Sequence, residues 1–133
     1  MAAAKLNTLH WHITDGNSVP IESKLFPDLA NKGAYALSMI YSQEQVKTIV
    51  EYARHRGIRV VPEFDMPGHA TAWALGSPAG VILNCSVLGK DSDGHWTSQF
   101  DPTSESTYTF LDAFIGEMAA LFPDKACPQW LEL

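Results

Sequence analysis

Three side chains that can hold or transfer a proton follow the ends of two predicted strands. Asp15 comes directly after residues 6–14, and Asp65 and His69 come directly after residues 58–64. In folds with parallel strands, binding and catalytic groups gather at the carboxyl ends of the strands. A carboxylate beside an imidazole orients the ring, fixes its tautomer and raises its basicity. Asp15, Asp65 and His69 are therefore candidate catalytic residues. The alternative is that the two aspartates shape turns and the histidine is an ordinary loop residue.

A histidine pair on the first strand is compatible with a metal site. His10 and His12 are two residues apart, so on a strand both imidazoles point to the same face. A metal site also needs a third ligand, for which Glu63, Asp65 and His69 are the candidates. The alternative is that both histidines form hydrogen bonds inside a barrel-like core. The spacing alone leaves both interpretations open.

Two strands must position these groups. Residues 6–14 are rich in β-branched and aromatic side chains and end at the turn cluster 15–18, which predicts a buried strand. Residues 58–64 predict a second strand that ends just before Asp65. A predicted helix follows each strand, and this alternation favours parallel pairing and an α/β fold.

Two helices are predicted to connect and follow these strands. Ser42 and Gln45 form a capping-box pattern, and Gly57 is a typical C-terminal stop. The apolar stripe of this first helix is Val46, Ile49, Val50 and Ala53. The second helix is predicted over roughly 104–122, with an apolar face of Tyr108, Leu111, Ile115, Met118 and Phe122. Between the second strand and this helix, residues 76–103 predict a long loop.

Size, composition and charge restrict the class of protein. The chain has 133 residues, of which 46% are hydrophobic and 18% charged, so it can bury one core. A net charge of −6 argues against a nucleic-acid partner, which a basic face would favour. No apolar run approaches the roughly 18 residues of a membrane span, and residues 1–6 lack the pattern of a signal peptide. Cys85 and Cys127 show no metal-binding or nucleophile pattern.

Eight longer sequence segments follow one another along the chain in a distinctive order. They are 5–15 (KLNTLHWHITD), 20–23 (PIES), 32–35 (KGAY), 41–44 (YSQE), 51–60 (EYARHRGIRV), 62–69 (PEFDMPGH), 101–103 (DPT) and 121–124 (LFPD). Together they resemble the catalytic domain of the β-N-acetylhexosaminidases of glycoside hydrolase family 20, from residue 4 to residue 125. The first segment resembles the family's K-L-N-x-x-H-W-H-x-x-D strand.

The resemblance implies a fold and an activity. The fold is an incomplete (β/α)8 TIM barrel with parallel strands. The activity is removal of terminal N-acetylglucosamine or N-acetylgalactosamine from glycans, glycoconjugates or chitin oligomers, with retention at the anomeric carbon. In this family the 2-acetamido oxygen of the substrate attacks the anomeric carbon and forms an oxazolinium intermediate. A glutamic acid protonates the leaving oxygen, and an adjacent aspartate orients the acetamido group. Family members need no metal or other cofactor, which makes His10 and His12 packing and hydrogen-bonding residues.

The resemblance assigns a family role to only a few residues of this chain. Asp15 and His69 match a polar relay behind the catalytic glutamic acid, and Asp65 matches a supporting aspartate. Cys85 matches a cysteine that forms a disulfide in some members. The sequence departs from the family after Lys125, where the catalytic G-G-D-E motif is expected and residues 126–130 read ACPQW. The substrate-gripping arginine of the family is also absent from this chain.

The resemblance therefore divides the chain into a partial barrel, 1–125, and a divergent tail, 126–133. It implies a hexosaminidase fragment that is inactive as the isolated chain. A non-catalytic glycan-binding or interaction fragment stays open, as does a metal-dependent barrel hydrolase that uses His10, His12 and His69. The expected partner is a glycan that ends in N-acetylhexosamine, and open barrel edges predict oligomers or aggregates. The family implies a lysosomal or extracellular location.

Overall fold

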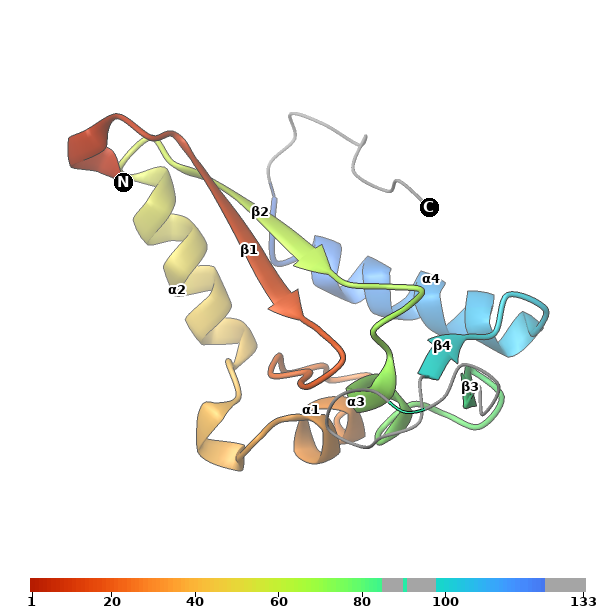
Figure 1. Cartoon of the computed structure of the whole chain (residues 1–133). Helices are drawn as coiled ribbons and strands as arrows, with labels where there is room; N and C mark the ends of the chain where they lie inside the picture. Colours follow the sequence, from red (N-terminus) through yellow and green to blue (C-terminus); the bar gives the residue numbers. More distant parts are fainter. Residues whose placement is uncertain (85–89, 91–97, 124–133) are drawn as a thin grey trace.

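The computed structural model describes residues 1–84, 90 and 98–123, and its elements alternate along the chain (Figure 1). The predicted order of strand, helix, strand and helix is confirmed by β1 (Thr8–Thr14), α2 (Gln43–Arg54), β2 (Arg59–Phe64) and α4 (Glu105–Ala119). The predicted tail and both cysteines lie outside the described residues. In chain order the elements are the short 3-10 helix Ala2–Ala4, β1 (Thr8–Thr14), α1 (Asp28–Gly33), the 3-10 helix Leu37–Met39, α2 (Gln43–Arg54), β2 (Arg59–Phe64), α3 (Thr71–Ala74), β3 (Ile82–Asn84), β4 (Ser98–Phe100) and α4 (Glu105–Ala119).

The strands β1 and β2 pair in parallel, as the sequence predicts. Their register begins with Thr8 opposite Arg59 and brings His12 opposite Glu63. The register shifts between His12 and Thr14, where β1 has an irregularity. Figure 1 shows both strands pointing the same way, so that their carboxyl ends meet at one edge of the sheet.

The helix α2 brings the chain back from the carboxyl end of β1 to the start of β2. Its predicted capping box is present: the Ser42 hydroxyl accepts from the Gln45 N–H at 3.2 Å, and the Gln45 side chain accepts from the Ser42 N–H at 2.9 Å. Val46 and Ala53 of the predicted stripe are buried. Gly57 has a φ of 65°, a left-handed conformation that glycine adopts without a steric penalty, and the helix has ended before it.

The hydrophobic core lies beyond the carboxyl ends of β1 and β2. Trp73 of α3 is fully buried, and its ring packs against Phe114 of α4 with centroids 5.1 Å apart. Phe64, at the end of β2, packs edge-to-face on the same Phe114 at 5.4 Å. Each large apolar side chain that is buried in this way contributes about 1.5–3 kcal/mol. The core therefore fixes α3 and α4 against the strand ends that carry the candidate residues.

The strand β1 is less buried than the sequence predicts. Only Ile13 and Thr14 are buried, and residues 8–12 alternate between exposed and partly exposed. Among the described strands, β2 is the only one that pairs with β1. The amino-terminal half of the strand therefore lacks the neighbours that would cover it, and the expectation of a buried strand holds only at its carboxyl end.

The buried face of α4 shares only Met118 with the predicted one. The buried side chains of the helix are those of Thr107, Phe110, Phe114 and Met118, whereas Tyr108 is 53% exposed. Leu111, Ile115 and Phe122 of the predicted face are only partly buried. Apolar residues occupy several sides of this helix, so a stripe at helical spacing does not identify the side that packs.

The predicted loop 76–103 contains a short antiparallel pair. β3 pairs with β4 from Ile82 opposite Phe100 to Asn84 opposite Ser98. Each strand has three residues, which is too short for a period-two pattern to stand out in the sequence. The backbone of β4 also holds the turn after β2, because the Phe100 N–H donates to the Pro67 carbonyl at 3.0 Å.

A carboxylate on α4 joins three separate parts of the chain. Glu117 accepts hydrogen bonds from the Ser23 hydroxyl at 2.5 Å, the Lys24 backbone N–H at 2.6 Å and the Gln43 side-chain amide at 2.7 Å. Hydrogen bonds to a charged acceptor are stronger than those between neutral groups. Glu117 therefore ties α4 to the segment before α1 and to the first residue of α2.

The surface carries many exposed apolar side chains for a small chain. No helix within the described ranges is long and apolar enough to cross a membrane. Large apolar residues that are at least half exposed are Leu6, Leu25, Tyr35, Leu37, Met39, Tyr52, Leu75 and Tyr108. Exposed apolar groups and unpaired strand edges both favour self-association.

We therefore expect the 133-residue polypeptide, expressed alone, to form oligomers or aggregates or to melt without a cooperative transition. Size-exclusion chromatography with light scattering measures its mass, and calorimetry measures its melting. A monomer at low concentration with one sharp cooperative transition would contradict this expectation.

Candidate functional site

The structure brings Asp15, Asp65 and His69 together at the carboxyl ends of β1 and β2. The Nδ1 atom of His69 lies 3.0 Å from Oδ1 of Asp15 and 2.9 Å from Oδ2 of Asp65. One imidazole nitrogen is thus shared by two carboxylates from different strand ends. The three residues form one polar cluster, and their catalytic role remains a prediction.

Local backbone contacts hold this cluster in place. The Thr14 hydroxyl, at the end of β1, accepts a hydrogen bond from the Asp65 backbone N–H at 3.0 Å. This bond connects the carboxyl ends of β1 and β2. The Gly16 carbonyl accepts from the Ala72 N–H at 2.9 Å and docks the turn after β1 on α3. His69 has a φ of 50°, an uncommon left-handed conformation for a residue with a side chain. Strained conformations of this kind persist where the surrounding structure over-determines them, as it does here.

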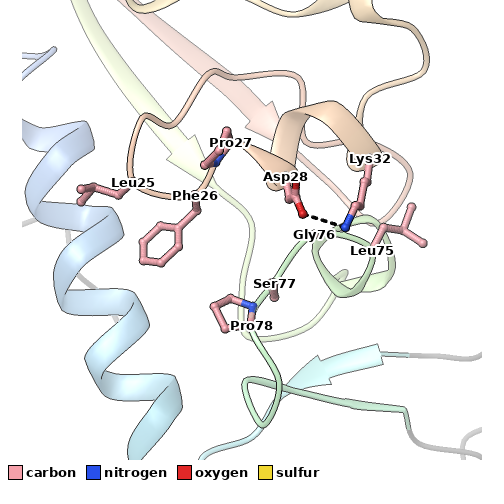
Figure 2. A pocket seen from close by; sticks show the side chains of 9 residues that line it. All are labelled: Leu25, Phe26, Pro27, Asp28, Lys32, Leu75, Gly76, Ser77 and Pro78. Carbon is pink, nitrogen blue, oxygen red and sulfur yellow. Dashed lines mark ion pairs between the residues drawn. The ribbon is translucent and has the colours of Figure 1, made fainter.

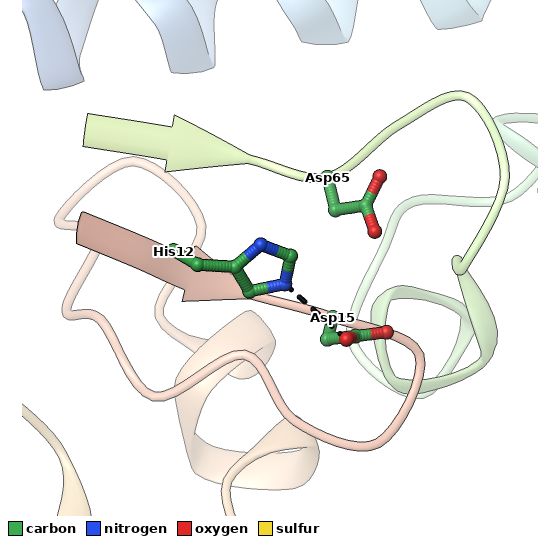
Figure 3. A group of neighbouring side chains, drawn as sticks. All are labelled: His12, Asp15 and Asp65. Carbon is green, nitrogen blue, oxygen red and sulfur yellow. Dashed lines mark hydrogen bonds and ion pairs between the residues drawn. The ribbon is translucent and has the colours of Figure 1, made fainter. Parts of the chain in front are cut away.

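His12 extends the cluster along β1 (Figure 3). Its Nε2 atom lies 3.2 Å from Oδ2 of Asp15, and its Nδ1 atom lies 3.1 Å from Oε1 of Glu63. The other oxygen of Glu63 contacts Nε2 of His10. The result is an alternating row of imidazoles and carboxylates, which we call the strand-end row: His10, Glu63, His12, Asp15, His69 and Asp65.

The charges of the row perturb two pKa values. The Gly16 backbone N–H, followed by the contacts with His69 and His12, holds the pKa of Asp15 below its usual value despite partial burial. Burial acts to lower the pKa of His12, but the contacts with Glu63 and Asp15 together outweigh it and raise this pKa. Both shifts favour the charged forms, a carboxylate at Asp15 and an imidazolium at His12.

The structure does not bring His10, His12 and His69 together as one metal site. Among the described residues, the group whose ligand-type atoms lie within 4.8 Å of one another is His12, Asp15 and Asp65 (Figure 3). His10 instead contacts Glu63, at the far end of the row from His69. The alternative of a three-histidine metal site is therefore wrong in its ligand set. The described contacts of these imidazoles are with carboxylates.

A cavity of about 420 Å³ lies beside α1 (Figure 2). Its walls come from residues 25–28, Lys32 and residues 75–78, and Lys32 and Asp28 form an ion pair at 2.7 Å. A side chain at Gly76 would collide with the Asp28 carbonyl, so glycine is required for this close approach. No residue of the strand-end row lines the cavity.

Glu63 is the residue whose place in the site the sequence analysis missed. It appears there only as a candidate third metal ligand, whereas in the structure it contacts both His10 and His12. The signal was available in the spacing: two histidines two residues apart share a face, and the parallel register places Glu63 opposite His12. The exact register of the two strands was needed to find it.

The structure is that of a parallel β/α unit with acid–base groups at the carboxyl ends of its strands, where barrel enzymes carry their active sites. Residues 1–128 match the catalytic domain of glycosyl hydrolase family 20. The chain belongs to this family, and its sequence corresponds to a part of the catalytic domain.

Known proteins resemble the chain over most of its length. The human beta-hexosaminidase subunit beta is 44% identical over 125 residues, which cover 94% of this chain and 22% of the human protein. A β-N-acetylhexosaminidase from Bacteroides fragilis superposes with a TM-score of 0.73 at 36% identity, covering 92% of this chain and 25% of that one. A Vibrio harveyi exo-β-N-acetylglucosaminidase in complex with N-acetylglucosamine superposes equally well, with a TM-score of 0.73 at 28% identity and a coverage of 92% and 22%. The chain spans less than a quarter of the length of the curated relatives it matches.

Proposed function

We propose that the chain is the part of a β-N-acetylhexosaminidase barrel that positions the catalytic acid. The observation that carries this proposal is the contact between Asp15 and His69 at the carboxyl ends of two parallel strands. Active sites of (β/α)8 barrels lie at this end of the strands. The family assignment supports the type of reaction, and the contact supports the proposed role of these two residues in it.

The Nε2 atom of His69, on the side of the ring away from the two carboxylates, supports a role in proton transfer. Its Nδ1 atom faces Asp15 and Asp65, and its Nε2 atom has no hydrogen-bond partner among the described residues. The ring is 67% exposed, so a group from outside this chain segment can reach it. A neutral ring with a proton on Nδ1 presents Nε2 as an acceptor, and a protonated ring presents it as a donor. In both states the ring acts on the proton affinity of a neighbouring glutamic acid.

In this proposal Asp15 and His69 are positioning residues, because they act through that glutamic acid. The acid would protonate the glycosidic oxygen while the 2-acetamido oxygen of the sugar attacks the anomeric carbon. Charged Asp15 orients the His69 ring, and Asp65 supports the same nitrogen from the second strand. The proposed substrate is a glycan that ends in N-acetylglucosamine or N-acetylgalactosamine.

The finer features of fold and location belong to the same proposal. β1, α2, β2 and α4 would form consecutive units of a (β/α)8 barrel, with further strands pairing at the edges of β1 and β2. A lysosomal or extracellular location follows from the family resemblance. The exposed row and the open strand edges agree with a site that is completed by other parts of a barrel.

We expect a full-length family 20 enzyme that contains residues 1–125 of this chain to hydrolyse nitrophenyl N-acetylglucosaminide. Release of nitrophenol measures the activity, and the nitrophenyl glucoside without the acetamido group is the control substrate. The acetamido oxygen is the nucleophile, so the control substrate should react at a negligible rate. Binding of the N-acetyl sugar without any turnover would favour a non-catalytic glycan-binding function instead.

A further inference from the structure

We propose that His12, held by Glu63, is a further positioning residue for this reaction. In this proposal His12 fixes one oxygen of Asp15 and so sets the orientation in which Asp15 holds His69. The inference rests on the proposed function and deepens it, because it adds a residue and a mode of action to the same site.

The two nitrogens of His12 are the first support. Nδ1 lies 3.1 Å from a Glu63 oxygen, and Nε2 lies 3.2 Å from an Asp15 oxygen. A neutral imidazole has one N–H and can donate to only one of these carboxylates, whereas an imidazolium donates to both. The geometry is therefore that of a protonated ring between two carboxylates. The side chain is 44% exposed, so pairing with these groups, more than burial, determines its charge.

The backbone determines which carboxylate holds the ring. Glu63 is the register partner of His12 across the parallel pair, so the spacing of β1 and β2 sets the distance between their side chains. Glu63 also contacts His10, which restrains the carboxylate from the opposite side. Glu63 thus has a fixed place on the sheet, and it orients the His12 ring towards the end of β1.

Both oxygens of Asp15 are occupied. Oδ2 faces His12, while Oδ1 faces His69 and accepts from the Gly16 N–H. A carboxylate that is held at both oxygens cannot rotate without losing a hydrogen-bond partner. Removal of His12 would free Oδ2, and the carboxylate that orients His69 would lose one of its restraints.

The test uses a full-length family 20 enzyme that contains this segment, with the variants His12→Ala and Glu63→Gln. We expect kcat to fall about tenfold in each, a fraction of the 10²–10⁴ that a general acid contributes, with KM changed less than twofold. Glu63→Gln keeps the shape of the side chain but removes the charge that raises the pKa of His12. Activity that needs the imidazolium is lost as pH rises through this pKa, so the alkaline limb of the kcat profile should move to lower pH.

A double-mutant cycle separates this mechanism from loss of structure. If His12 acts through Asp15, His12→Ala should lower kcat little further in an Asp15→Asn background, whereas independent structural damage would add. Glu51→Gln is the matched control, because it breaks a carboxylate–imidazole contact with His55 on the exposed side of α2 at 2.9 Å. It should leave kcat and the pH profile unchanged.

Three outcomes would overturn the inference. One is an active parent enzyme in which both variants keep the parent kcat and pH profile. Another is an additive double-mutant cycle, and the third is a Glu51→Gln variant that behaves like Glu63→Gln. If His12→Ala fails to fold, His12→Gln, which keeps an N–H donor towards Asp15, replaces it, and its kcat should fall by less than the factor of about ten expected for the alanine variant. An inactive parent enzyme would instead contradict the proposed function itself.

Discussion

We expect the 133-residue polypeptide to release no measurable nitrophenol from nitrophenyl N-acetylglucosaminide, which is the largest effect predicted for this chain. The sequence contains no G-G-D-E motif, which supplies the general acid and the acetamido-orienting aspartate in the resemblance described above. Loss of a general acid alone removes a rate factor of about 10²–10⁴. A full-length relative, assayed at the same molar concentration, provides the reference rate.

Turnover by this polypeptide near the reference rate would mean that another group supplies the proton. Glu63 would be the first candidate, because it lies on β2 in contact with two histidines of the strand-end row. A Glu63→Gln variant of the polypeptide would then decide the question, since it removes the only proton that this side chain can donate.

The second large effect is expected from Asp15→Asn and His69→Ala in a full-length enzyme that contains this segment. Both should lower kcat by about 10- to 100-fold and change KM little, because they act on the proton of the neighbouring glutamic acid and not on sugar binding. Asp15 is held as a carboxylate, with its pKa lowered by the Gly16 N–H and by His69. The asparagine keeps the shape but removes that charge, so the pH profile of kcat should also shift.

His55→Ala is the control for these two variants. His55 lies at the carboxyl end of α2, where it contacts Glu51, and it is remote from the strand ends. It should leave kcat nearly unchanged. If His55→Ala and His69→Ala have equal effects, or if Asp15→Asn changes only KM, the two site residues are structural and the relay assignment is wrong.

The predictions that succeeded depended on local signals. The capping box of Ser42 and Gln45 and the stop at Gly57 are determined by a few neighbouring residues, and α2 follows them. The parallel pairing of β1 and β2 followed from the alternation of strands and helices. Asp15 and His69 were found together because the carboxyl ends of parallel strands meet at one edge.

The features that the sequence did not reveal depend on contacts between distant segments. The burial of Phe110 and Phe114, in place of Tyr108, reflects where Trp73 lies, and nothing in α4 itself encodes that position. The contact of His12 with Glu63 needs the register of two strands that are separated by a whole helix. Hydrophobic periodicity describes one helix or strand at a time. It therefore does not predict contacts between side chains of different elements.

The three hydrogen bonds to Glu117 have a consequence for how the chain acquires its structure during synthesis. Their donors come from Ser23, Lys24 and Gln43, which are 74 to 94 residues earlier in the chain. A ribosome makes the chain from its amino terminus, so the segment before α1 leaves the ribosome long before its acceptor exists. Contacts of such high sequence separation form late and slow folding. The first half of the chain therefore stays without this anchor until α4 has been made and has docked.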